Sequence, residues 1–131
     1  MLFCWPIRIY YEDTDAGGVV YHARYAHFFE RARTEMLREK GFEQQKLRKE
    51  NLAFVVRKMT IDYLHPAKLD DLLTVETTIT YVQLTSLAFF QRLINQQGKE
   101  ICTAKIVIVS IDTFKMKPTR LPESIVAEFK Q

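Results

Sequence analysis

The sequence predicts an α+β fold in which one long helix packs against a single antiparallel sheet of five strands. Residues 22–40 carry apolar side chains at the spacing of an amphipathic helix, whereas four strand-like runs fill most of the chain after residue 52. The connections between those runs are short, and short connections join antiparallel neighbours. One helix and one sheet bury their apolar faces most simply against each other, in two layers.

A strand, a loop and the helix occupy the first third of the chain. Apolar and polar residues alternate over residues 3–11, the period of a half-buried strand, and Pro6 indicates its start or an exposed edge. The polar segment 12–18 is expected to form a loop. The helix over residues 22–40 follows, and Gly41 supplies the left-handed residue that ends it.

The rest of the chain is expected to complete the sheet and to end in a short helix. The two edges of such a sheet would offer unused hydrogen-bonding groups, which predicts association of subunits. The expected elements are strands over 53–64, 72–82, 86–95 and 100–111, a hairpin turn at Gly98, a helical turn within 43–51, and a helix over 122–129 that packs through Ile125 and Phe129.

Composition limits both the domain organisation and the chemistry. The 131 residues suffice for one domain, residues 1–131, with an ordinary hydrophobic core. The sequence has four glycines with one adjacent pair, Gly17-Gly18, which excludes the glycine-rich loops that bind nucleotides. None of its three serines has the flanking glycines of a nucleophile elbow. Cys4 and Cys102 are far apart and are expected to be free thiols of a reducing compartment.

Charge and hydropathy give no sign of a nucleic-acid partner or a membrane span. The net charge is +3, and the charged residues are interspersed along the chain. No apolar run approaches the ~20 residues that a membrane-spanning helix needs. The spacing of His22 and His27 does not place them on one helical face, and His65 has no partner at ligand spacing, which argues against a metal site. We therefore expect a cytoplasmic protein without a bound metal.

The residues with chemical potential gather in one segment, residues 10–25. It holds Asp13, Asp15, the pair Gly17-Gly18 and His22. Paired glycines let the backbone approach a ligand closely, and a helix start presents free amides with about half a positive charge. A carboxylate beside such amides suits acyl transfer. The alternative is that one of the acids only caps the helix and that His22 is a surface residue.

The same segment carries a resemblance to a known family. The run YEDTDAGGVVYHARY at residues 11–25, followed by ERARTE at residues 30–35, resembles the signature of the YbgC-type acyl-CoA thioesterases. These belong to the 4-hydroxybenzoyl-CoA thioesterase branch of the hotdog-fold superfamily. The likeness extends over nearly the whole chain. It implies a hotdog fold, with a long central helix wrapped by the sheet, and homodimers that often pair into a homotetramer.

The resemblance also implies which residues form the site. The family's catalytic carboxylate falls on Asp15, and its partners fall on Tyr11 and His22. The thioester carbonyl would face an amide at the helix start near His22, with Gly17 and Gly18 as substrate-binding residues. Two routes stay open: Asp15 attacks the thioester directly, or it activates a water molecule.

Substrate and partners follow from the same resemblance. It implies short-chain acyl-CoA thioesters, or thioesters of acyl carrier protein, as substrates. The anionic coenzyme A handle makes Arg57 and Lys58 candidate binding residues, and no cofactor beyond the substrate's own coenzyme A is expected. Asp13 is assigned to the structure of the loop.

Two other functions are weighed against the thioesterase. The first is a non-catalytic scaffold that binds acyl carrier protein and phospholipid-synthesis enzymes at the inner-membrane periphery, in the genetic neighbourhood of the Tol-Pal system. The presence of Tyr11, Asp15 and His22 together favours the enzyme. The second is a hotdog dehydratase, which needs a different arrangement of histidine and acid on the helix.

Overall fold

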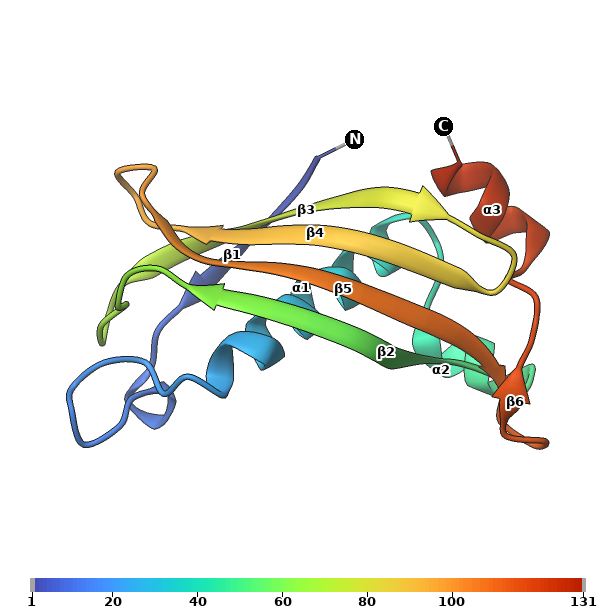
Figure 1. The fold of residues 1–131 in the computed structure, drawn as a ribbon, viewed down its shortest axis with the longest axis horizontal. Helices are drawn as coiled ribbons and strands as arrows, with labels where there is room; N and C mark the ends of the chain where they lie inside the picture. The colour runs from blue at the N-terminus through green and yellow to red at the C-terminus, as the bar shows by residue number, and fades with distance from the viewer. Residues whose placement is uncertain (1, 131) are drawn as a thin grey trace.

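The structure, a computed structural model, describes residues 2–130 and consists of one sheet with α1 packed across one of its faces (Figure 1). The sheet order is β1-β3-β4-β5-β2, and every pairing is antiparallel. The α+β prediction is therefore confirmed. The strands are β1 (Phe3–Arg8), β2 (Leu52–Tyr63), β3 (Leu72–Val82), β4 (Ser86–Ile94), β5 (Glu100–Asp112) and β6 (Lys117–Pro118), and the helices are α1 (Arg24–Glu39), α2 (Gln44–Lys49) and α3 (Glu123–Phe129).

The prediction of five strands is wrong by one short strand. β6 pairs with the end of β5 through Ile111–Pro118 and Asp112–Lys117, which gives a six-stranded sheet. Two residues in an irregular tail show no alternation, so periodicity has no signal for such a strand. The predicted strand over 72–82 has the bounds of β3, and the others agree with β2, β4 and β5 to within one residue at each end.

The core lies between α1 and the face of the sheet that it covers. α1 buries a stripe of large side chains at helical spacing, as its sequence predicts. Each of these side chains contributes roughly 1.5–3 kcal/mol through burial. α3 closes one end of the core through Ile125 and Phe129, also as predicted. The principal buried residues of α1 are Tyr25, Phe28, Phe29, Ala32, Met36 and Leu37, and they pack with Leu73, Val75, Leu87, Phe89, Leu93 and Ile106 from the sheet.

Two boundaries near the N-terminus differ from the prediction. β1 ends at Arg8 rather than at Tyr11, because residues 11–13 form a 3-10 turn that leaves the Tyr11 side chain 82% exposed. The helix begins at Arg24 rather than at His22, because the Arg24 amide closes a separate turn onto the carbonyl oxygen of Tyr21 at 2.9 Å. Apolar periodicity reports which side of a segment is buried and does not distinguish such turns from a helical turn.

Glycine ends α1 and turns the last hairpin. Gly41 has φ of 90° and Gly98 has φ of 78°, both in the left-handed region that residues with a Cβ rarely adopt. Both positions are as the sequence predicts.

β1 and β2 form the edges of the main sheet. Within residues 2–130, no helix is long and apolar enough to cross a membrane.

Both cysteines are free, and they lie in opposite environments. Cys4 is exposed on β1, whereas Cys102 is fully buried on β5, where burial raises the pKa of its thiol to about 12. Because the thiolate is the reactive form, Cys102 is protected both by its protonation and by the protein around it.

We therefore predict that the native protein reacts rapidly with one equivalent of a disulfide reagent such as DTNB. The second equivalent reacts only after unfolding in denaturant. Cys4→Ser is the matched control and removes the rapid phase. Rapid reaction of two equivalents in the native state would contradict the assignment of Cys102 to the core.

Candidate active site

The loop that joins β1 to α1 folds back on itself as a short hairpin and is anchored to the loop between β2 and β3. Thr14 pairs with Val20, and Val19 pairs with Lys68, in isolated antiparallel bridges. The Val20 amide also donates to the carbonyl oxygen of Ala67 at 2.9 Å. These contacts hold residues 15–18 as the tip of the hairpin. In Figure 1 this hairpin projects beyond the sheet next to the start of α1.

Asp13 is the buried acid of this loop. Its side chain is only 5% exposed and forms an ion pair with Arg24, the first residue of α1, at 2.7 Å. The other carboxylate oxygen accepts a hydrogen bond from the Tyr10 amide at 2.9 Å, and the Asp13 carbonyl oxygen accepts one from the Tyr21 amide at 2.8 Å. Asp13 therefore joins both sides of the loop to the helix, which agrees with its assignment to loop structure.

Asp15 lies at the exposed tip of the same hairpin. Its Oδ1 accepts a hydrogen bond from the Gly17 amide at 2.8 Å, and its carbonyl oxygen accepts one from the Gly18 amide at 3.0 Å. Gly18 has φ of 79°, and a Cβ at Gly17 would lie 3.2 Å from Asp15 Oδ1. The glycine pair therefore lets the chain turn tightly around the Asp15 carboxylate, and the second oxygen of that carboxylate is left without a partner among residues 2–130.

The start of α1 has backbone amides that face no acceptor. The residue before the helix is Ala23, and no side chain of residues 2–130 caps the helix N-terminus. Neither acid of the loop is therefore a helix cap, which contradicts that part of the alternative, whereas His22 is an exposed residue, as the alternative expects. Within the described chain, no hydrogen-bond acceptor is found for the N–H groups of His22 and Ala23. Such free amides at a helix start carry partial positive charge and attract an oxyanion.

His22 borders a cavity of about 270 Å³ at the junction of α1 and the end of β2. The Tyr63 hydroxyl donates to the His22 carbonyl oxygen at 3.3 Å, and the Tyr63 ring lies edge-on to the rings of His22 and Tyr25, with centroids 6.2 and 5.6 Å apart. Burial raises the pKa of both tyrosine hydroxyls, so both keep their protons at neutral pH. His65 also lines this cavity.

Tyr63 was not among the site residues predicted from the sequence. It lies 41 residues from His22 in the chain, and its place at the end of a strand gives no chemical signal. The pairing of a strand end with a helix start, which brings the two together, is a tertiary contact. Only knowledge of how the end of β2 packs against the start of α1 could have indicated it.

The three predicted catalytic residues share the loop, but no bond found within residues 2–130 joins them. Tyr11, Asp15 and His22 are all exposed, and among residues 2–130 no hydrogen bond or ion pair joins any two of them. The exposed side of this site is therefore open in the single chain.

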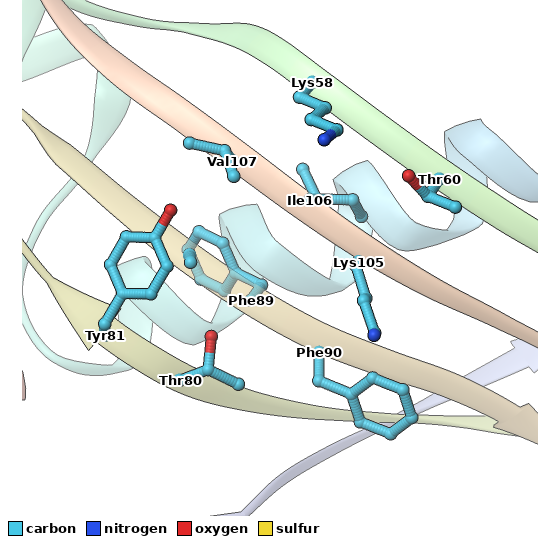
Figure 2. Close-up of a pocket in the computed structure, with 10 residues that line it drawn as sticks. Lys58, Thr60, Thr80, Tyr81, Phe89, Phe90, Lys105, Ile106 and Val107 are labelled. Atoms are coloured by element: carbon cyan, nitrogen blue, oxygen red, sulfur yellow. The ribbon is translucent and has the colours of Figure 1, made fainter.

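The two predicted cationic residues lie elsewhere on the molecule. Lys58 projects from the face of the sheet opposite α1, where it lines a cavity of about 470 Å³ with Lys105, Tyr81 and Val107 (Figure 2). Arg57 is exposed at the irregularity of β2, where the pairing with β5 skips one residue. The cavity beside Lys58 shares no lining residue with the cavity beside His22.

Comparison with known proteins places the chain in a family. A model of the thioesterase-like superfamily matches residues 10–129. The chain is 59% identical over 130 residues to the acyl-CoA thioester hydrolase YbgC of Escherichia coli O6:H1, covering 99% of this chain and 97% of that one. It is 52% identical over 128 residues to the acyl-CoA thioesterase YbgC of Haemophilus influenzae, covering 97% and 93% of the two chains.

Solved structures agree with the sequence relatives. A probable thioesterase from Bartonella henselae superposes with a TM-score of 0.89 at 40% identity, covering 93% of this chain and 100% of that one. A 1,4-dihydroxy-2-naphthoyl-CoA thioesterase from Synechocystis has a TM-score of 0.92 at 22% identity, over 98% and 96% of the two chains, and supports the fold alone. The expected hotdog fold is thereby confirmed. The chain belongs to the YbgC-type acyl-CoA thioesterases of the thioesterase-like superfamily and is a thioester hydrolase.

Proposed function

We propose that this chain hydrolyses short-chain acyl-CoA thioesters to a free acid and coenzyme A, with Asp15 as the catalytic carboxylate. The observation that carries the proposal is the contrast between the two acids of the loop. The Asp13 carboxylate is buried and paired, whereas the Asp15 carboxylate is exposed and has one oxygen free of partners within residues 2–130. A group that must meet a substrate has to be accessible and uncommitted.

The helix start supplies the second part of the mechanism. In thioester hydrolysis the carbonyl oxygen gains negative charge as the tetrahedral intermediate forms. The free N–H groups of His22 and Ala23 would donate to this oxygen, and the dipole of α1 would favour its charge. Removal of one such donor in other enzymes costs about 10²–10³ in kcat.

Asp15 completes the reaction by one of two routes. It attacks the carbonyl carbon, so that the thiolate leaves and the resulting mixed anhydride is hydrolysed by water, or it takes a proton from the water that attacks. Tyr11 and His22 would orient Asp15 or the water and assist the departing thiolate. Gly17 and Gly18 would let the thioester approach the backbone closely. We expect no cofactor, because the coenzyme A in this reaction is part of the substrate.

The substrate handle and the assembly belong to the same proposal. Arg57 and Lys58 would contribute positive charge near the edge strand β2, where a second subunit would join the sheet in a homodimer or homotetramer. Because one side of the site is open in the single chain, a partner subunit would contribute residues there. Thioesters of acyl carrier protein would be further substrates, and the enzyme would act in the cytoplasm.

The competing proposal is a non-catalytic scaffold that binds acyl carrier protein and phospholipid-synthesis enzymes at the inner-membrane periphery, linked to the Tol-Pal system. A panel of acyl-CoA and acyl-carrier-protein thioesters, followed by release of free thiol, separates the two. We expect the highest rates with short acyl-CoA thioesters. Rates across the whole panel no higher than those of an Asp15 variant would favour the scaffold.

We predict that Asp15→Asn lowers kcat for acyl-CoA hydrolysis by roughly 10²–10⁴-fold, because the amide neither attacks nor accepts a proton. The asparagine still offers Oδ1 to the Gly17 amide, so the hairpin tip is kept and the melting temperature is unchanged. Glu12→Gln removes an exposed acid from the same loop and is the matched control, with activity near that of the wild type. Near-normal turnover by Asp15→Asn would contradict the assignment of Asp15 as the catalytic carboxylate.

For Asp13→Asn we predict the opposite pattern. The neutral side chain loses the charge that pairs with Arg24, so the free energy of unfolding falls by about 1–3 kcal/mol. Urea denaturation measures this loss. Below the unfolding temperature, kcat falls far less than in Asp15→Asn. A variant that is as stable as the wild type but inactive would transfer the catalytic role to Asp13.

A further inference from the structure

Arg33 is a buried cation on α1 without a carboxylate partner. The residue is 6% exposed, and within residues 2–130 no acid lies at ion-pair distance from it. Burial lowers the pKa of its guanidinium to about 10, so it stays charged at neutral pH. Buried charges in proteins are normally paired, because removing a lone charge from water is costly. This charge is partly compensated by the negative charge of Glu30, which raises the pKa of Arg33 against the effect of burial, and by the Phe89 ring, whose centroid lies 6.0 Å from the guanidinium carbon.

A buried network fixes the direction of the guanidinium. Arg33 Nη1 donates to Gln91 Oε1 at 3.0 Å. The Gln91 amide nitrogen donates in turn to the Phe29 carbonyl oxygen at 3.0 Å and to the Thr77 hydroxyl at 2.9 Å. Gln91 and Thr77 are fully buried. Within residues 2–130 one nitrogen of the planar Arg33 fork forms a hydrogen bond, and the remaining donors would be able to bind a ligand.

Arg33 lines a cavity of about 160 Å³ between α1, the start of α2 and the edge strand β2. Apolar side chains, including Leu37 and Phe54, form part of the wall. Thr34 also lines it, and because its hydroxyl accepts from Gln44 at 3.1 Å, its own proton is free to donate. The volume equals that of about five water molecules, which is too small for a nucleotide and sufficient for a carboxylate with a short alkyl chain.

We propose that Arg33 anchors a binding site for a small carboxylate between α1 and β2. A carboxylate accepts two parallel hydrogen bonds from a guanidinium, which is the geometry that satisfies a fixed arginine fork best. The apolar wall suits the alkyl part of the ligand. Glu30 borders the same cavity, and within residues 2–130 it does not lie at ion-pair distance from Arg33. Its negative charge raises the pKa of Arg33 and opposes an anionic ligand. The carboxylate is either a free short-chain acid or the terminal carboxylate of an acyl group.

The first test is binding of acetate to the whole protein, read as the melting temperature at constant ionic strength with chloride as the reference anion. A ligand that binds only the folded state at ten times its Kd raises the melting temperature by about 4 °C for a domain of this size. We expect this rise in the wild type, its loss in Arg33→Met, and a larger rise at the same acetate concentration in Glu30→Gln. Arg38→Met, which removes an exposed arginine of the same helix, is the matched control and keeps the rise.

An equal rise in the wild type, Arg33→Met and Arg38→Met would overturn the proposal, because it would report a general salt effect. Absence of any rise in the wild type would overturn it as well. Where Arg33→Met fails to fold, Glu30→Gln decides alone: a rise no larger than that of the wild type contradicts a carboxylate next to Glu30.

The second test separates the two sources of the carboxylate and is the only arm that rests on the proposed function. Hydrolysis of glutaryl-CoA is compared with that of pentanoyl-CoA, which has the same number of carbons and no terminal charge. If the acyl group supplies the carboxylate, the kcat/KM for glutaryl-CoA divided by that for pentanoyl-CoA falls at least about tenfold in Arg33→Met. A tenfold fall corresponds to the loss of one charged hydrogen bond. An unchanged ratio assigns the site to a free acid.

Discussion

The ion pair between Asp13 and Arg24 is the contact on which the proposed active site depends. It joins the loop after β1 to the first residue of α1, and the same carboxylate holds the Tyr10 amide. With Asp13 fixed, the chain has to return through the hairpin tip to the start of the helix. Asp15 and the free amides of His22 and Ala23 are thereby kept on one short segment. Asp13, which holds the loop, is buried, whereas Asp15, which is assigned to the chemistry, is exposed. Two acids only two residues apart therefore have different roles.

The sheet determines what surrounds this segment. β2 ends at Tyr63, whose hydroxyl contacts the His22 carbonyl oxygen, so the helix start is held from the sheet side as well as from the loop side. The other end of the α1–β2 junction holds Arg33 and its cavity. β2 is also an edge strand, and both cavities therefore border the place where a second subunit would extend the sheet. This position accounts for a site that has two fixed sides and one open side.

Much of the fold could be predicted from the sequence because the spacing of apolar residues differs between strands and helices. The alternation in residues 72–82 predicted β3 to the residue, and the apolar stripe predicted which face of α1 is buried. The helix start at Arg24 could not be predicted, since the turn over residues 21–24 precedes the helix directly and apolar periodicity does not distinguish it from a first helical turn. Asp13 and Asp15 are equivalent in composition, and only the resemblance to a family chose between them. Tyr63 and Gln91 were missed because their roles arise from contacts between distant segments.

The proposed mechanism requires the thioester carbonyl to lie between the Asp15 carboxylate and the amides at the start of α1. The most direct measurement is a crystal structure with an acyl-CoA analogue in which a methylene group replaces the sulfur atom, so that the carbonyl is kept and cannot be hydrolysed. We predict the carbonyl oxygen at hydrogen-bonding distance from the His22 or Ala23 amide, with an Asp15 oxygen within about 3.5 Å of the carbonyl carbon or of a water next to it. A carbonyl bound away from the helix start, for example in the cavity beside Lys58, would contradict it.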